Sequence, residues 1–179
     1  MVNLVIRPKH LRDATSDALM TRECATCNKL GDVTKYVLCD ACGEHYHLGC
    51  VGLSRLPVGF WYCGGCLQEI AAGRLRDVTV DLPLMTYLFQ GLLPSDDCEA
   101  TRVLSASHFL YVHHHDLIIS GKTGPRVIPA IAERYEILLH YHRLQHCHGE
   151  KLYQTLSRNF FWRGLRTDCC EFVTACRTC

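Results

Sequence analysis

The chain has 179 residues, a formal net charge of +1 and thirteen cysteines, which is room for one ordinary domain or two small ones. A balanced charge of this kind excludes a uniformly basic nucleic-acid binder. The two halves nevertheless differ in sign, because residues 1–99 carry 9 Lys and Arg against 12 Asp and Glu and residues 100–179 carry 10 against 6. Any surface that binds nucleic acid is therefore expected in the second half.

Residues 1–21 lack the long apolar core and small-residue cleavage site of a signal peptide. We expect this segment to be disordered and the chain to occupy a reducing compartment. There, Cys-x2-Cys units accompanied by histidines are more often zinc ligands than disulfides. No apolar stretch approaches the roughly 20 residues that a membrane span requires, so we expect a soluble protein.

Residues 22–68 contain eight potential metal ligands in four pairs, each with two residues between its members: Cys24 and Cys27, Cys39 and Cys42, His47 and Cys50, Cys63 and Cys66. Eight such ligands saturate two tetrahedral zinc ions and leave no open position, which indicates structural rather than catalytic metal. A histidine in fifth place, and Trp61 two residues before the seventh ligand, resemble the PHD finger. The ordinary RING finger of ubiquitin ligases has its histidine fourth, so a ubiquitin ligase is disfavoured.

The PHD resemblance implies that the ligand pairs interleave. One zinc would then be held by Cys24, Cys27, His47 and Cys50, and the other by Cys39, Cys42, Cys63 and Cys66. The two metals would replace most of a hydrophobic core in so short a stretch, with Tyr46 and Trp61 filling the rest.

The same resemblance implies binding of a histone tail, which would pair with an edge strand at Tyr36, Val37 and Leu38. Glu23 and Asp40 would pair with basic residues of an unmodified tail. The alternative interpretation is that both acids are simply solvated. In readers of trimethyl-lysine a cage tryptophan usually stands two residues before the ligand histidine, where this chain has His45, and its loss weakens the cation–π attraction.

Residues 69–98 are expected to form a helical linker. A short helix is predicted in "LQEIAAGRLRDV" and a second between Pro83 and Pro94, on which Leu84, Leu88 and Leu92 share one face. Two β-rich runs around Gly121 to Gly124 then predict a β-hairpin. The consecutive histidines at 113–115 would alternate faces on a strand and cannot converge on one ion, so we expect a solvated strand edge.

Cys176 and Cys179 form a further Cys-x2-Cys pair. His142 and His146 lie one helical turn apart, so these four residues could make a Cys2His2 zinc site, with His148 as a rival to His146. The sequence "HRLQHCHGEKLYQTLSRNFFWRGLRTDCCEFVTACRTC" resembles the zinc-binding domain of retroviral and gypsy-type retrotransposon integrases. The matching positions are Lys151, the Phe161-Trp162 pair, Gly164, Asp168 and the Phe172-Val173 pair, whereas Leu152, Arg163 and the late Gly149 depart from the pattern.

Residues 99–179 would thus form an integrase-like domain with its zinc site at 142–179. Periodicity places Ile131, Tyr135, Leu138 and His142 on the core face of its first helix. The core face of the last helix would carry Leu165, Cys169, Phe172, Val173 and Cys176. Zinc would clip the two helices together around Leu156, Phe160 and Trp162, and the non-ligand Cys147, Cys169 and Cys170 are expected to be buried.

The predicted fold is a small, zinc-stabilised α+β chain: a cross-braced two-zinc PHD finger, a β-hairpin and a three-helix integrase-like zinc domain. The resemblances imply a nuclear, non-catalytic fragment of a retrotransposon polyprotein with three zinc ions, since strand transfer belongs to a following core domain. The expected partners are a histone tail or other peptide, a second integrase protomer or its core, and DNA. The residues expected to contact DNA are Lys151, Arg158, Arg163 and Arg166. The alternative is a host chromatin-associated adaptor derived from such an element.

Overall fold

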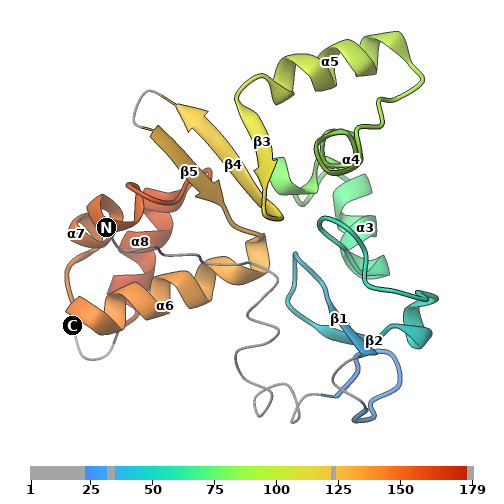
Figure 1. The fold of residues 1–179 in the computed structure, drawn as a ribbon. Helices are drawn as coiled ribbons and strands as arrows, with labels where there is room; N and C mark the ends of the chain where they lie inside the picture. Colours follow the sequence, from blue (N-terminus) through green and yellow to red (C-terminus); the bar gives the residue numbers. More distant parts are fainter. Residues whose placement is uncertain (1–22, 32–34, 122–123, 177–179) are drawn as a thin grey trace.

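The computed structural model describes residues 23–31, 35–121 and 124–176 (Figure 1). The segment 1–21, expected to be disordered, lies outside these ranges. No helix in the described part is long and apolar enough to cross a membrane. The strands and main helices follow in the order β1 (Tyr36–Leu38), β2 (His45–His47), α3 (Gly64–Ala71), α4 (Leu82–Gln90), α5 (Asp97–Ser107), β3 (Leu110–His113), β4 (Asp116–Gly121), β5 (Gly124–Ile128), α6 (Arg134–Gln145), α7 (Gly149–Leu156) and α8 (Leu165–Thr174).

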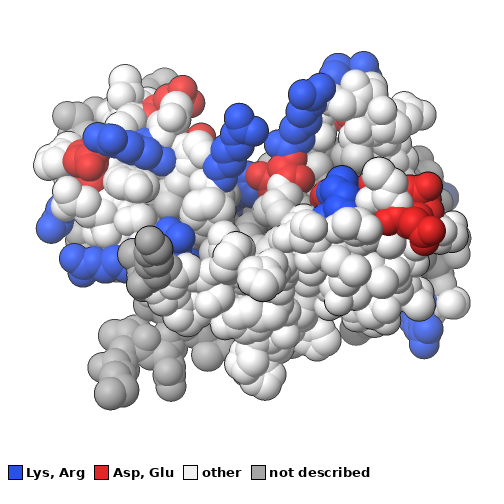
Figure 2. Space-filling view, turned by 90° about the horizontal axis from the view of Figure 1, so that it is seen from above, with Lys and Arg blue, Asp and Glu red and all other residues white. Residues whose placement is uncertain are grey.

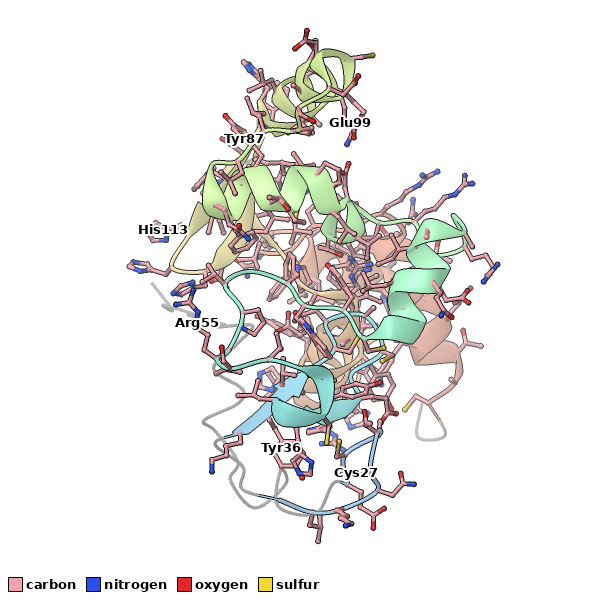
Figure 3. The ribbon with its side chains drawn as sticks, turned by 90° about the vertical axis from the view of Figure 1, so that its right-hand side faces the viewer. Cys27, Tyr36, Arg55, Tyr87, Glu99 and His113 are labelled. Atoms are coloured by element: carbon pink, nitrogen blue, oxygen red, sulfur yellow. The ribbon has the colours of Figure 1, made fainter. Side chains whose placement is uncertain are left out.

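The N-terminal unit has little regular structure. It consists of the antiparallel pair β1 and β2, a short 3-10 turn, η2 (Gly49–Val51), and helix α3. Helix α3 begins directly after Cys63, three residues before the predicted helix, and ends at Ala71. Figure 3 places Tyr36 and Cys27 of this unit at the end of the molecule opposite Tyr87 and Glu99. Loops and turns therefore carry most of its predicted metal ligands.

Two helices fill the middle of the chain. Asp81 caps α4 by accepting a hydrogen bond from the backbone N–H of Leu84, and the helix ends at Gly91 with a φ of 73°. Because α4 stops there, Leu92 lies beyond it and is 59% exposed, so its expected place on the apolar face is wrong. Helix α5 was not predicted. The expected boundary between the linker and the integrase-like domain, between residues 98 and 99, lies within this helix.

The β-region forms a three-stranded antiparallel sheet in the order β3, β4, β5. The predicted turn between Gly121 and Gly124 joins β4 and β5. A second turn at His114 and His115, with φ values of 48° and 72°, joins β3 and β4. Positive φ at both positions is typical of a two-residue hairpin turn. His114 and His115 therefore form the hairpin turn, whereas His113 is the last residue of the edge strand β3 and projects outward in Figure 3.

Helices α6, α7 and α8 form a bundle, and the segment between α7 and α8 pairs with the sheet. Residues 159–161 pair in parallel with β5, because Val127 donates to the carbonyl of Asn159 and Phe161 donates to that of Val127. The bundle core consists of Ile137, Leu138, Tyr141, Leu152, Leu156, Phe160, Trp162, Leu165 and Cys169. Backbone hydrogen bonds thus join the sheet to the helical bundle (Figure 1).

Two predicted core positions in the bundle are wrong. Tyr135 is 60% exposed, although its ring contacts that of Phe172 and its spacing to the buried Leu138 and His142 on α6 (Arg134–Gln145) is helical; a 3-10 turn, η4 (Ile131–Glu133), precedes this helix. Cys170 is exposed, whereas Cys169 is buried and Cys147 packs partly against the core. Gly149 explains how closely α7 and α8 approach, since a Cβ atom there would lie 2.7 Å from the Cα of Cys170.

Candidate metal centres

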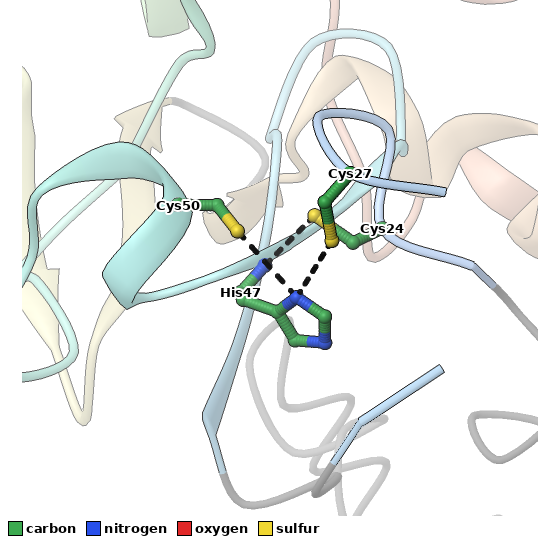
Figure 4. Close-up of side chains that lie close together, drawn as sticks. All are labelled: Cys24, Cys27, His47 and Cys50. Atoms are coloured by element: carbon green, nitrogen blue, oxygen red, sulfur yellow. Dashed lines mark hydrogen bonds between the residues drawn. The ribbon is translucent and has the colours of Figure 1, made fainter. Parts of the chain in front are cut away.

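The first ligand cluster joins the loop before β1 to the end of β2 and the turn after it. The ligand atoms of Cys24, Cys27, His47 and Cys50 all lie within 4.8 Å of one another. The Nδ1 atom of His47 is 3.4 Å from the sulfur of Cys27 and 3.6 Å from that of Cys50 (Figure 4). Tetrahedral zinc with ordinary bond lengths requires a sulfur-to-nitrogen separation of about 3.5 Å. These distances therefore fit the edges of a zinc tetrahedron.

The second cluster joins the β1–β2 turn to the start of α3. Cys39, Cys42, Cys63 and Cys66 again place their sulfurs within 4.8 Å of one another. The sulfurs of Cys42 and Cys63 are 3.9 Å apart, close to the separation of about 3.8 Å between two sulfurs on tetrahedral zinc. Cys63 precedes the first turn of α3 and Cys66 lies in it. The ligand pairs interleave as the PHD resemblance implies.

Backbone donors and crowding shift the thiol pKa values in opposite directions. Burial raises the pKa of Cys24, but backbone N–H groups led by that of His47 outweigh it and lower this pKa to about 6. The pKa of Cys50 is raised to about 11 by burial and by the neighbouring Cys27 and Cys24. Several thiolates so close together repel one another unless a cation lies among them. The donor set therefore suits a divalent, thiolate-binding metal.

The third cluster lies where α6 and α8 end. Ligand atoms of His142, His146 and Cys176 lie within 4.8 Å of one another. His142 is in the last turn of α6 and 2% exposed, and His146 follows that helix in a left-handed conformation with a φ of 40°. The fourth predicted ligand, Cys179, lies outside the described residues.

The rival ligand His148 has a different role. Its Nδ1 atom accepts a hydrogen bond of 3.4 Å from the backbone N–H of Lys151, so His148 caps the N-terminus of α7. Of the two rival histidines, only His146 lies in the cluster with His142 and Cys176. The choice of His146 over His148 therefore agrees with the geometry.

One glycine near the first cluster was not singled out in the sequence. A Cβ atom on Gly31 would lie 2.2 Å from Nε2 of His47, so any side chain there would push the imidazole aside. Nε2 is buried, and no described residue forms a hydrogen bond with it. The ligand spacing carries no signal for this contact, since Gly31 is not part of any Cys or His pair.

The residues expected to bind a peptide fall into two groups. Glu23 is exposed, and β1 supplies a two-stranded sheet with an edge strand. Asp40, however, is 8% exposed, and its carboxylate accepts a hydrogen bond of 2.6 Å from the backbone N–H of Trp61. Asp40 therefore links the two halves of the finger through this hydrogen bond. Its expected pairing with a basic residue of the tail does not fit the structure. His45 is also buried, edge-on to Tyr36.

The residues expected to bind nucleic acid lie on or beside α7 and α8. Lys151, Arg158 and Arg163 are exposed. Arg166 is exposed as well, but it forms an ion pair of 2.9 Å with Glu150. On the face seen in Figure 2, Lys and Arg side chains are interspersed with Asp and Glu and do not merge into one basic patch. Nucleic-acid binding by this surface would therefore rest on few cations.

Comparison with known proteins gives two separate family matches within the chain. Residues 24–66 match the PHD-finger family model, and residues 130–179 match that of the integrase zinc binding domain. The chain is 40% identical over 50 residues to tyrosine-protein kinase BAZ1B of Danio rerio, covering 27% of this chain and 3% of that protein. It is 34% identical over 64 residues to the histone-lysine N-methyltransferase ATXR6 of Arabidopsis thaliana, covering 35% and 18%.

A retroviral protein is also similar. The Pro-Pol polyprotein of simian foamy virus type 3 is 24% identical over 94 residues, which is 48% of this chain and 8% of the polyprotein. The chain thus spans between 3% and 18% of the length of these three relatives. The domain models and the ligand clusters agree, and together they show that the chain contains a PHD finger at residues 24–66, followed by an integrase zinc-binding domain at residues 130–179.

Proposed function

We propose that this chain is a non-catalytic, zinc-dependent binding module of a retrotransposon polyprotein that acts in the nucleus. Its PHD finger binds a histone tail or another peptide, and its integrase domain binds DNA or a partner integrase. Three structural zinc ions hold the two units in shape, the third completed by Cys179. The observation that carries this proposal is the presence of both domains in one chain, together with a Pro-Pol match longer than residues 130–179.

A host chromatin-associated adaptor derived from such an element is the second candidate. The similarity to BAZ1B and ATXR6 favours it, because it links the chain to cellular proteins as well as to a viral one. The genomic sequence downstream distinguishes the two candidates. A continuing reading frame with spaced acidic residues supports the retrotransposon, and an intact stop codon supports the adaptor.

The outer edge of β1 supports peptide binding by strand addition. Cys39 donates its backbone N–H to the carbonyl of Glu44. Because bonded and non-bonded pairs alternate in an antiparallel ladder, the backbone groups of Tyr36 and Leu38 point to the opposite edge. No backbone hydrogen bond to that edge is made within residues 23–31, 35–121 and 124–176. An extended peptide could therefore pair there.

A tail peptide with unmodified lysine is expected to bind the zinc-loaded chain more tightly than its trimethylated form. Methylation removes the donors that would pair with the exposed Glu23 carboxylate, and the buried His45 offers no open aromatic face. Titration calorimetry with both peptides measures the difference. Glu23→Gln should reduce the preference, whereas Glu171→Gln, an exposed acid on α8, should not. Tighter binding of the trimethylated peptide would contradict this specificity.

Binding of duplex DNA is expected to be weak and strongly dependent on salt. Two to four phosphate contacts imply that log affinity falls with log salt at a slope of roughly −2 to −4. Replacing Arg158 and Arg163 together by Gln should make this slope shallower by about two. The matched control replaces Arg55 and Arg74 of the finger by Gln. A fluorescence titration at several salt concentrations measures the slope, and an unchanged slope in the Arg158 and Arg163 variant would remove this surface from DNA binding.

A further inference from the structure

The finger packs against the start of α6 on the side of its second ligand cluster. Ile131 of η4 packs against the group of buried residues that includes Cys39 and Cys63. The backbone N–H of Ala132 donates a hydrogen bond of 3.2 Å to the carbonyl of Asp40. A Cβ atom on Gly43 would lie 3.6 Å from the Cβ of Ala132, which is ordinary contact distance. The segment that begins the integrase domain therefore touches the finger directly beside its metal ligands.

The chain between the two units reinforces this contact. The ring of Phe60 in the finger lies 5.6 Å from that of Phe89 on α4, edge to face. Gly59 has a φ of 86°, and its Cβ position is only 3.0 Å from Phe89, so only glycine allows this close approach. The Tyr62 hydroxyl donates to the carbonyl of Thr79 in the 3-10 turn η3 (Val78–Val80). Residues 67–81 therefore pack against the finger and do not form a flexible linker.

A buried ion pair joins this connecting segment to the bundle. The guanidinium of Arg134, in the first turn of α6, is 2.8 Å from the carboxylate of Asp77, and their side chains are only 13% and 7% exposed. Asp77 also caps η3 through the backbone and hydroxyl of Thr79. On its other side, Arg134 lies 5.5 Å from the centre of the Trp162 ring in the bundle core. Arg134 therefore contacts both the segment leaving the finger and the zinc-binding helices.

We propose that the PHD finger and the integrase domain form one rigid body, with Arg134 as the residue that couples them. Removing either partner would leave the other charge buried and unpaired, which is strongly destabilising while the two units stay docked, so loss of one partner should favour their separation. The edge of β1 and the exposed cations of the bundle are then presented to a partner in one fixed geometry. This inference goes beyond the proposed function, because it requires neither a peptide nor DNA.

Nuclear magnetic relaxation of backbone amides in the full, zinc-loaded chain tests this proposal. Amides of residues 24–66 and of residues 134–176 should report one shared rotational correlation time. Arg134→Met should separate the two values and remove the exchange protection of the Ala132 amide that bonds to Asp40. Arg143→Met, an exposed arginine on the same helix, should leave both measurements unchanged.

Asp77→Asn provides a second test that does not alter the bundle. The Asn oxygen can still accept the cap from Thr79, but the negative charge that pairs with Arg134 is lost. We expect the same separation of correlation times, with the zinc content unchanged. Two different correlation times in the unaltered chain would overturn the rigid body. A single shared time in both Arg134→Met and Asp77→Asn would overturn the coupling role of Arg134.

Discussion

Removal of zinc by a chelator is expected to unfold the finger and the three-helix bundle. The largest fully buried residues of the finger include the ligands Cys24 and Cys39 themselves, with Val37 as an apolar neighbour. A segment of this size cannot bury enough apolar surface to fold without metal. Structural zinc supplies about 10–16 kcal/mol in small domains, against a typical total stability of about 5–15 kcal/mol. Circular dichroism during the chelator titration should show loss of structure, and added zinc should restore it.

A matched pair of cysteine variants separates metal ligation from thiol chemistry in general. Cys39→Ser should abolish the second cluster and unfold the finger even in excess zinc. Cys98→Ser should have little effect, because Cys98 is exposed on α5 and belongs to none of the three clusters among the described residues. Retention of native dichroism after complete metal removal would contradict the structural role of zinc.

Phe160→Ala is expected to destabilise the integrase domain by about 3–5 kcal/mol, the usual cost of removing a fully buried aromatic ring. Phe160 is 2% exposed, packs edge to face against Tyr141, and lies in the segment that pairs with β5. Its loss would open a cavity where the sheet meets the bundle. Urea denaturation of the zinc-loaded chain, followed by tryptophan fluorescence and dichroism, measures the change.

Phe109→Ala is the matched control, since Phe109 is 61% exposed. Exposed positions of this kind usually change stability by less than about 0.5 kcal/mol. Equal losses of stability in Phe160→Ala and Phe109→Ala would show that Phe160 does not occupy the core described for it.

The metal centres were the most predictable part of this chain. Tetrahedral zinc restricts ligand spacing so strongly that pairs such as Cys63 and Cys66 are visible in the sequence. Their assignment to two interleaved sites came from the PHD resemblance, because spacing alone allows other pairings. The choice between His146 and His148 required coordinates, since it depends on where α6 ends and α7 begins.

The burial of single helix positions and the number of hairpins were harder to predict. Tyr135 is exposed although its spacing to the buried Leu138 and His142 on α6 is helical, because spacing gives the face of a helix and not how far along that face its partners extend. The histidines at 113–115 have no glycine to mark a turn. Helix α5 did leave a signal that was missed, because Asp96 is its N-cap and Glu99 lies three residues later.

The roles of Asp40 and Arg134 could not be predicted from local patterns. Asp40 stands in a motif where an acid is expected, but its carboxylate bonds to the backbone of Trp61, 21 residues further along the chain. Arg134 pairs with Asp77 across the whole middle segment. Contacts between residues so distant in sequence depend on how the elements pack together, and no spacing rule encodes that.

The number of bound zinc ions tests the proposed architecture most directly. Native mass spectrometry of the full chain should find three zinc ions, one for each cluster. Cys176→Ser should lower the number to two, whereas His148→Ala, which removes only a helix cap, should leave it at three. Two zinc ions in the unaltered chain, or three in Cys176→Ser, would contradict the assignment of the third centre.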